Sequence, residues 1–177
     1  MMYKLLVPLA TSILATGAYA NTEIIGSVDS KCIIISETPG VYGNPNPYQL
    51  TTAPTSGGVK PIIRYDVLVA DYYKAVIDHP VEFTSAPTLD DVVNWTGDVT
   101  VSEVSDTTMS DYDTNKVEYN NSHEYDLTVS GSTWFTVSST ADYGSTKSFP
   151  AGQYTAVVEA ECIPHSGLIM SVVKIGY

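Results

Sequence analysis

Positive charge is scarce in this sequence. Lys and Arg together number 8 against 20 Asp and Glu, the formal net charge is −12 at pH 7, and Arg64 is the only arginine. Phosphate recognition depends on basic side chains and on a positive field, so nucleic acids and anionic membrane surfaces are poor partners for this chain. The acidity favours solubility after export, with divalent-cation binding as the alternative.

Enzyme motifs are also missing. The three histidines (His79, His123 and His165) have no partner at metal-ligand spacing, and the sequence contains neither HExxH nor GxSxG. No phosphate loop or dinucleotide fingerprint occurs. Glu159 and Glu161 share one face of a strand pattern, which is typical of a solvated surface. We therefore expect a non-enzymatic protein that needs no cofactor.

Long apolar runs are confined to the N-terminus. Lys4 precedes an apolar run over 5–15, and a small-x-small cleavage site follows at 18–20. This order predicts a secretory signal peptide over residues 1–20, too short to span a bilayer. No later run reaches eighteen apolar residues, so we expect no membrane span in the mature chain. Residues 21–177 are expected to form a single domain, secreted to the periplasm or an extracellular surface.

Cysteine is limited to two residues, Cys32 and Cys162. In an exported protein, an isolated pair is most simply a disulfide. Such a bond requires the two Cα atoms to lie within about 7 Å, which would make the first and last parts of the domain neighbours. Two free thiols or an intermolecular bond are the alternatives.

What the sequence does have is period-two alternation, with little helical periodicity. From 154 to 162, the apolar residues Tyr154, Ala156, Val158, Ala160 and Cys162 alternate with a second face. This pattern predicts a half-buried strand whose buried face carries the cysteine. Similar segments are found at 61–70, 98–104, 124–130 and 133–138, and apolar strands are expected near 24–35 and 168–175.

Turn signals separate these segments. Proline and glycine clusters predict a long loop over 37–60, and Gly131-Ser132 is typical of a two-residue hairpin turn. Residues 102–122 are polar and are interpreted as a mobile loop or hairpin tip. A two-turn helix is predicted near 88–95, with Thr88 and Asp91 in a capping-box arrangement. Short strands with Gly/Pro turns predict an all-β sandwich, with a barrel as the alternative.

One acidic loop has the alternation that calcium ligands require. Asp111, Asp113 and Asn115 place oxygen atoms at alternate positions. An EF-hand would have glycine at the position of Lys116 and glutamate at the position of Ser122. These departures favour an ordinary acidic loop over a Ca²⁺ site, but both hypotheses stay open.

Tyrosine is the remaining surplus, with 13 in the chain. Tyrosine suits interfaces because one end of the side chain is apolar and the other polar. Tyr42 and Tyr48 fall in the predicted Pro/Asn-rich loop. At these positions the sequence favours a partner-binding role and a structural role equally. The patterns Asn94-Trp95-Thr96 and Asn120-Asn121-Ser122 fit glycosylation acceptors.

Two stretches resemble the exported fimbrial, pilin-like subunits of bacteria. The run from Gly26 to Ile34 is similar to a pilin's first strand, and the run from Phe149 to Val157, which contains Pro150-Ala151-Gly152-Gln153-Tyr154, is similar to a late pilin strand. The resemblance implies an immunoglobulin-like or pilin-like sandwich completed by a strand from the next subunit. The sequence departs from the family because Cys162 lies near the C-terminus, because little chain precedes Gly26, and because 167–177 could supply the missing strand.

The sequence therefore predicts a secreted structural or adhesive surface subunit. It would assemble through β-edge pairing or tyrosine-rich contacts with itself or another exported protein subunit. The alternative is a secreted glycan- or calcium-binding module, and a hydrolase with an unrecognised site is the third hypothesis.

Overall fold

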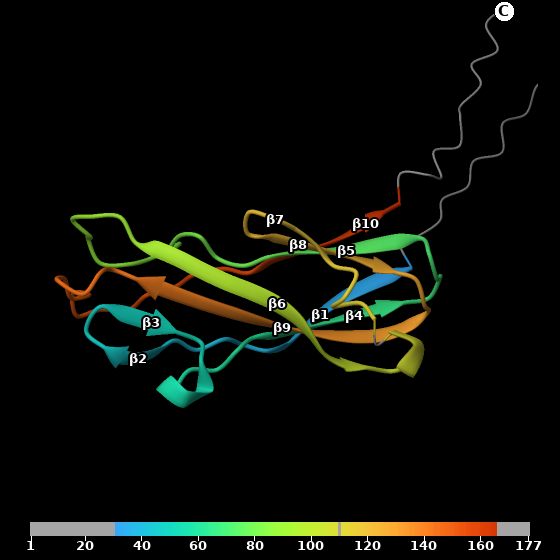
Figure 1. Ribbon diagram of the computed structural model, residues 1–177, viewed down its shortest axis with the longest axis horizontal. Coiled ribbons are helices and arrows are strands. Elements are labelled where there is room, and N and C mark those ends of the chain that lie inside the picture. Colours follow the sequence, from blue (N-terminus) through green and yellow to red (C-terminus); the bar gives the residue numbers. More distant parts are fainter. Residues whose placement is uncertain (1–30, 110, 166–177) are drawn as a thin grey trace, which may run out of the picture.

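The computed structural model describes residues 31–109 and 111–165, and nearly all regular structure in it is β (Figure 1). Two antiparallel sheets stack as a sandwich, which confirms the predicted fold class. The first sheet has the order β1-β4-β9-β3-β2, with β6 also paired to β9, and the second has the order β10-β5-β8-β7. The strands are β1 (Cys32–Thr38), β2 (Gly43–Asn46), β3 (Gln49–Thr51), β4 (Ile62–Val67), β5 (Tyr73–Asp78), β6 (Asn94–Val104), β7 (Val117–Tyr119), β8 (Ser122–Leu127), β9 (Gly131–Asp142) and β10 (Glu159–Pro164).

Strand β9 organises the first sheet. On one side it pairs with β6 along almost its whole length, and on the other side with β4 at its start and β3 at its end. Its side chains alternate strictly between buried and half-buried, as the period-two pattern at 133–138 predicts. β9 therefore turns one buried face toward the second sheet, and this face is apolar except at Thr133 and Ser139.

Large aromatic side chains fill the space between the sheets. Tyr65 from β4, Tyr125 from β8 and Phe135 from β9 are at most 1% exposed. The Phe135 ring centroid lies 5.4 Å from that of Tyr65 and 4.6 Å from that of Tyr125. Edge-to-face and tilted contacts of this kind stabilise the core beyond their burial alone. Ile77 of β5 in the second sheet is also fully buried and belongs to the same core.

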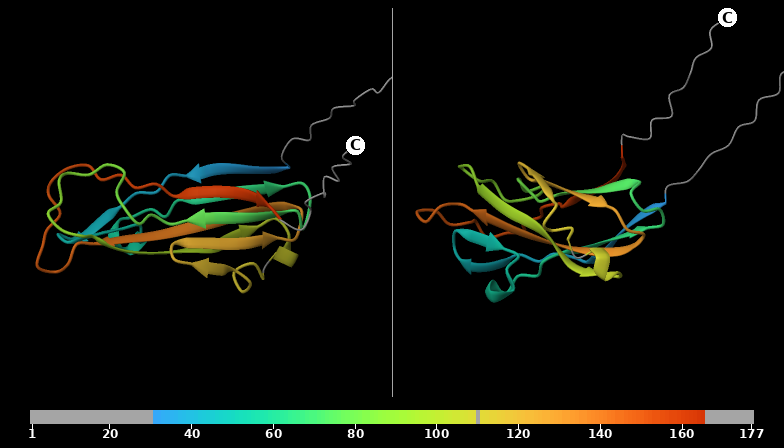
Figure 2. Two further views of the ribbon diagram at one scale, coloured as in Figure 1. Left: turned by 90° about the horizontal axis from the view of Figure 1, so that it is seen from above. Right: turned by 45° about the vertical axis from the view of Figure 1, so that its right-hand side comes forward.

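The predicted disulfide is present. Cys32 on β1 and Cys162 on β10 are bonded, with their Cα atoms 6.4 Å apart. These strands are edge strands of different sheets, and they lie along the same side of the sandwich (Figure 2). The described chain also begins and ends at this end of the molecule, since Lys31 N–H donates to Tyr73 Oη and His165 N–H donates to Tyr72 O.

The helix predicted near 88–95 is not formed. Residues 88–93 are irregular, and Asn94 and Trp95 begin β6. Asp91, expected to close a capping box, accepts the N–H of Val92 with Oδ1 at 2.8 Å instead. Short polar side chains that bond nearby backbone groups compete with the helix in this way. Cross-strand pairing of Trp95 with Ala141 favours the strand.

Three further boundaries differ from the sequence interpretation. The predicted loop over 37–60 contains β2, β3 and a short 3-10 helix at Pro54–Ser56, because β3 finds a partner in the end of β9. Gly131 begins β9 rather than forming a hairpin turn, since β8 and β9 belong to different sheets. Of the predicted mobile loop over 102–122, residues 102–104 end β6, Thr107–Met109 form a short 3-10 helix, and β7 and β8 form a hairpin whose tip is Asn120 and Asn121.

The strand predicted over 154–162 is paired over only part of its length, but its side chains alternate in burial throughout. Only 159–164 pair with β5, while Thr155 makes an isolated bridge with Ser85. Half-buried and exposed side chains still alternate from 154 to 162. The predicted signal peptide over 1–20 and the strand segments at 24–30 and 168–175 lie outside the described residues. No described helix has the length and apolarity needed to cross a membrane.

Candidate functional site

One long edge of the sandwich is closed by side chains. On the outer side of β6, the carboxylate of Asp113 accepts the N–H of Val101 at 2.9 and 3.1 Å. The hydroxyl of Tyr125 donates to Val99 O at 2.6 Å, and Lys116 Nζ donates to the same oxygen at 3.2 Å. The middle of the β6 edge, at Val99 and Val101, is therefore bonded within the chain and is blocked for pairing with another strand.

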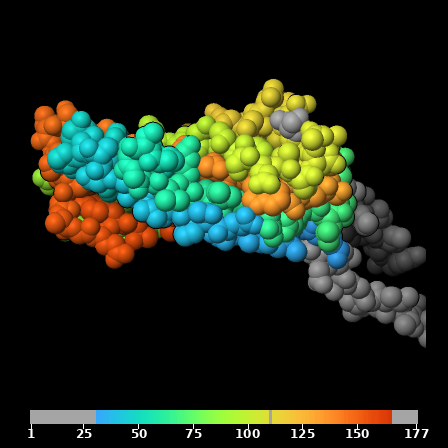
Figure 3. Space-filling model, turned by 90° about the horizontal axis from the view of Figure 1, so that it is seen from below, coloured from blue at the N-terminus to red at the C-terminus, as the bar shows by residue number. Residues whose placement is uncertain are grey.

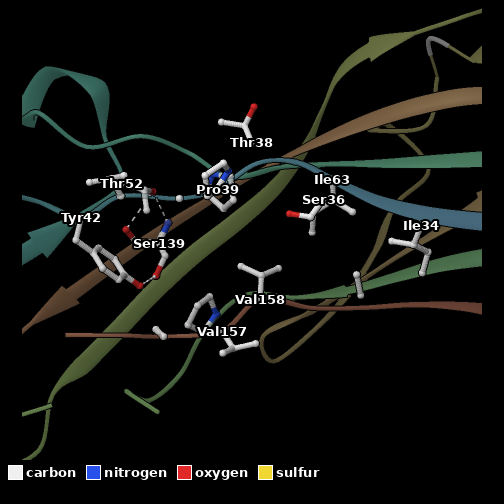
Figure 4. Close-up of a pocket in the computed structure, with 16 residues that line it drawn as sticks. Ile34, Ser36, Thr38, Pro39, Tyr42, Thr52, Ile63, Ser139, Val157 and Val158 are labelled. Atoms are coloured by element: carbon white, nitrogen blue, oxygen red, sulfur yellow. Dashed lines mark hydrogen bonds between the residues drawn. The ribbon is translucent and has the colours of Figure 1, made fainter. Parts of the chain in front are cut away.

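The opposite edge is not covered by any strand in the described part of the chain. Here β1 of the first sheet and the segment 156–160 of the second face each other, tied at one end by the disulfide. Between them lies a groove with a cavity of about 460 Å³ (Figure 4). In the space-filling view of Figure 3, β1 is at the molecular surface along this side. The groove is lined by Ile34, Ser36, Thr38, Pro39, Gly40, Val41, Tyr42, Thr52, Pro61, Ile63, Pro80, Ser139, Ala156, Val157, Val158 and Ala160.

The groove wall is uncharged. None of the described residues lining it is Asp, Glu, Lys, Arg or His, although the chain has a net charge of −12. Ile34 and Val157 leave much of their side chains in solvent, at 36% and 50% exposed residue surface. An exposed apolar surface with polar surroundings is a mark of interaction sites.

The backbone of β1 adds directional bonding groups to this wall. Leu68 N–H donates to Lys31 O at 2.9 Å, which sets the alternation of the β1–β4 ladder. In an antiparallel pair, every second residue directs its N–H and C=O away from the partner strand. Ile34 and Ser36 are such residues, and no described strand pairs with this side of β1.

The other wall repeats this arrangement. His165 N–H donates to Tyr72 O at 2.8 Å, so the β10–β5 register directs the backbone groups of Ala160 away from β5. Ala160 also lines the groove. Among the described residues, the site therefore presents backbone groups of Ile34, Ser36 and Ala160 that no strand pairs with, above an apolar floor, an arrangement that suits an extended peptide strand.

Of the two predicted partner-binding tyrosines, only Tyr42 reaches this groove. Its Oη lies 2.9 Å from Ser139 Oγ, and burial raises the pKa of its phenol, an effect that the bond to Ser139 partly offsets. Tyr48 lies in the β2–β3 turn, where its carbonyl accepts the N–H of Tyr143 at 2.8 Å. The structure does not bring the two tyrosines together on the groove wall.

Tyr42 also belongs to a cluster of aromatic rings at the end of the sandwich away from the disulfide. Its ring centroid lies 6.4 Å from Phe83 and 6.5 Å from Trp95, and Phe83 lies 4.7 Å from Trp95. Phe149 and Tyr154 continue the cluster through Phe83. These rings pack on one another and anchor the irregular segments around β6, so their main role is structural.

The predicted calcium ligands lie in consecutive turns before β7. Both carboxylate oxygens of Asp113 accept the Val101 N–H. Asp111 is exposed, and its carbonyl accepts the N–H groups of Thr114 and Asn115 at 3.1 and 3.2 Å. Calcium binding by Asp111, Asp113 and Asn115 stays a prediction.

Comparison with known proteins found no matching family, no matching curated protein and no matching solved structure.

Proposed function

We propose that this chain is a secreted, non-enzymatic structural or adhesive surface subunit that assembles through its open sheet edge. A single observation carries the proposal: Ile34 and Ser36 of β1 and Ala160 of β10 direct backbone groups that no described strand pairs with toward an uncharged groove. An extended strand from a second copy, or from another exported subunit, would add to one of these edges. Main-chain hydrogen bonds would supply affinity, and apolar side chains would fill the groove.

The contrast between the two edges supports this assignment. Proteins avoid unwanted edge pairing by placing charges, bulges or covering loops on exposed strands. The β6 edge follows that rule at Val99 and Val101, which Lys116 and Asp113 cover. The β1 edge has a bulge between Ser36 and Thr38 near its end, but Ile34 and Ser36 are uncovered by any described segment. The incomplete sandwich implied by the resemblance to fimbrial subunits fits the same interpretation.

The test compares two valine-to-lysine substitutions of similar exposure. Val157 lines the groove and is 50% exposed, while Val117 lies on β7, the edge strand at the far side of the second sheet, and is 58% exposed. A lysine in the groove places a hydrated charge where the partner strand would pack. Light scattering during size exclusion should show concentration-dependent oligomers for the unmodified protein and for Val117→Lys, and monomers for Val157→Lys.

Circular dichroism should show that both variants keep the β fold, because both positions are exposed. The proposal that copies assemble with one another fails if the unmodified protein stays monomeric over the whole concentration range. It also fails if the two substitutions weaken assembly equally.

A further inference from the structure

Three potential metal ligands converge on the closed edge of the sandwich, opposite the groove. Asp98 belongs to β6 of the first sheet, whereas Glu118 belongs to β7 and His123 to β8 of the second. One ligand atom from each residue lies within 4.8 Å of the other two. The stacking of the two sheets brings these residues together.

His123 is the central member of this cluster. Its side chain is only 4% exposed, and its Nε2 lies 3.4 Å from Asp98 Oδ1 and 4.0 Å from Glu118 Oε1. Its Nδ1 is buried and has no hydrogen-bond partner among the described residues. Nε2 is the ring nitrogen that faces the two carboxylates, so it is the atom that would bind a cation.

An internal cation already sits between the two carboxylates. Lys116 Nζ lies 2.7 Å from Asp98 Oδ1 and 2.7 Å from Glu118 Oε1. About half of each carboxylate side chain is exposed, so the site opens to solvent. The ammonium group is carried on a flexible four-carbon stem and can therefore move into solvent when another cation enters.

We infer that Asp98, Glu118 and His123 bind a divalent transition cation of the Zn²⁺ type, which displaces the Lys116 ammonium. In tetrahedral zinc sites with bonds of 2.0–2.2 Å, neighbouring ligand atoms are about 3.3 Å apart. The separation of His123 Nε2 and Asp98 Oδ1 matches that value, and the exposed Glu118 needs only a small movement. Ca²⁺ and Mg²⁺ prefer oxygen ligands alone, so the imidazole selects a transition metal.

The site would link the two sheets. The disulfide joins the edge strands β1 and β10, and a bound metal would join β6 to β7 and β8 along the other long edge. Because the cation binds the folded arrangement, it would raise the melting temperature of the protein. This inference does not depend on the proposed assembly function.

The test is a calorimetric titration of the metal-stripped protein with zinc chloride. The melting temperature is measured at each molar ratio of zinc to protein. The unmodified chain should bind one equivalent. Glu118→Gln, at an exposed position, and His123→Gln should each weaken binding at least tenfold. The matched control is His165→Gln, because His165 Nε2 also lies near a carboxylate, 3.1 Å from Asp126 Oδ1, but outside the cluster.

Lys116→Met gives a test in the opposite direction. Removing the competing ammonium should tighten zinc binding at least tenfold and enlarge the zinc-induced rise in melting temperature. The inference is overturned if neither the unmodified protein nor Lys116→Met binds zinc. It is also overturned if Lys116→Met binds no more tightly, or if His165→Gln weakens binding as much as Glu118→Gln does.

Discussion

The hydroxyl of Tyr65 crosses from one sheet to the other and donates a hydrogen bond of 3.0 Å to the carbonyl oxygen of Glu161. Tyr65 belongs to β4 and Glu161 to β10, and the same hydroxyl lies 3.2 Å from Val76 O on β5. The tyrosine is fully buried. It therefore fixes the depth at which the second sheet packs on the first, close to the disulfide.

Replacing Tyr65 with Phe should lower the free energy of unfolding by about 1–2 kcal/mol, because the buried carbonyl oxygen loses a donor while the ring packing is kept. Urea unfolding followed by far-UV circular dichroism measures this change. Tyr119→Phe is the control, since Tyr119 on β7 is 75% exposed and should change stability by less than about 0.5 kcal/mol. Equal losses in the two variants would contradict the role assigned to the Tyr65 hydroxyl.

Alternation in the sequence predicted the sheets but not all of their strands. The buried positions of β4, β8 and β9 follow the period-two pattern, because each of these strands has one face on the core. Strand β5 was missed although the buried residues Tyr73, Ala75 and Ile77 alternate with the half-buried Lys74, Val76 and Asp78. The nearby Tyr72 and Asp71 obscured where that alternation begins.

The candidate sites could not be predicted from the sequence, because both depend on how distant segments stack. Ile34 and Val158 line one groove only because β1 and the segment that leads into β10 face each other across the sandwich. Asp98 and His123 have no motif spacing, and they meet only because β6 lies over β8. The disulfide was predictable because the chain contains only two cysteines and an export signal was expected.

Loss of the disulfide should destabilise the protein strongly. Cys32 and Cys162 are separated by 130 positions, and closing a loop of that length restricts the unfolded chain by about 5 kcal/mol at most. The double variant Cys32→Ser/Cys162→Ser should therefore unfold at a clearly lower urea concentration than the oxidised protein. Adding a reductant to the unmodified protein should reproduce this loss, and adding it to the double variant should change nothing. A reductant effect on the double variant would contradict the assignment.

Gly97 on β6 should tolerate no side chain. A Cβ at this position would lie 2.5 Å from His79 Cγ and 2.7 Å from the carbonyl oxygen of Ser138. Because the histidine ring is buried and the carbonyl belongs to a paired strand, neither can move freely. Gly97→Ala should lower the free energy of unfolding by about 1–3 kcal/mol, measured by urea unfolding in the presence of a chelator. Thr96→Ala, one position earlier and exposed, should have a much smaller effect.

Alkaline pH should weaken the fold through its buried tyrosines. Burial raises the pKa of Tyr65 and of Tyr125 well above 10, and nearby carboxylates, chiefly those of Glu161 and Asp113 respectively, raise both further. Below pH 10 the phenols are protonated in both the folded and the unfolded protein. Above pH 10 the unfolded chain loses these protons while the folded protein keeps them, so stability falls as pH rises.

Each buried tyrosine should contribute a slope of about 1.4 kcal/mol per pH unit above pH 10. Urea unfolding between pH 9 and pH 11 measures the total slope, to which lysines with raised pKa values add in the same direction. Tyr125→Phe isolates the tyrosine part, because it removes one titrating group and leaves the lysines in place. This variant should lose stability at neutral pH, where the hydrogen bond to Val99 O is absent, yet show a shallower decline above pH 10. A decline as steep as that of the unmodified protein would mean that Tyr125 ionises as readily in the folded state as in the unfolded one.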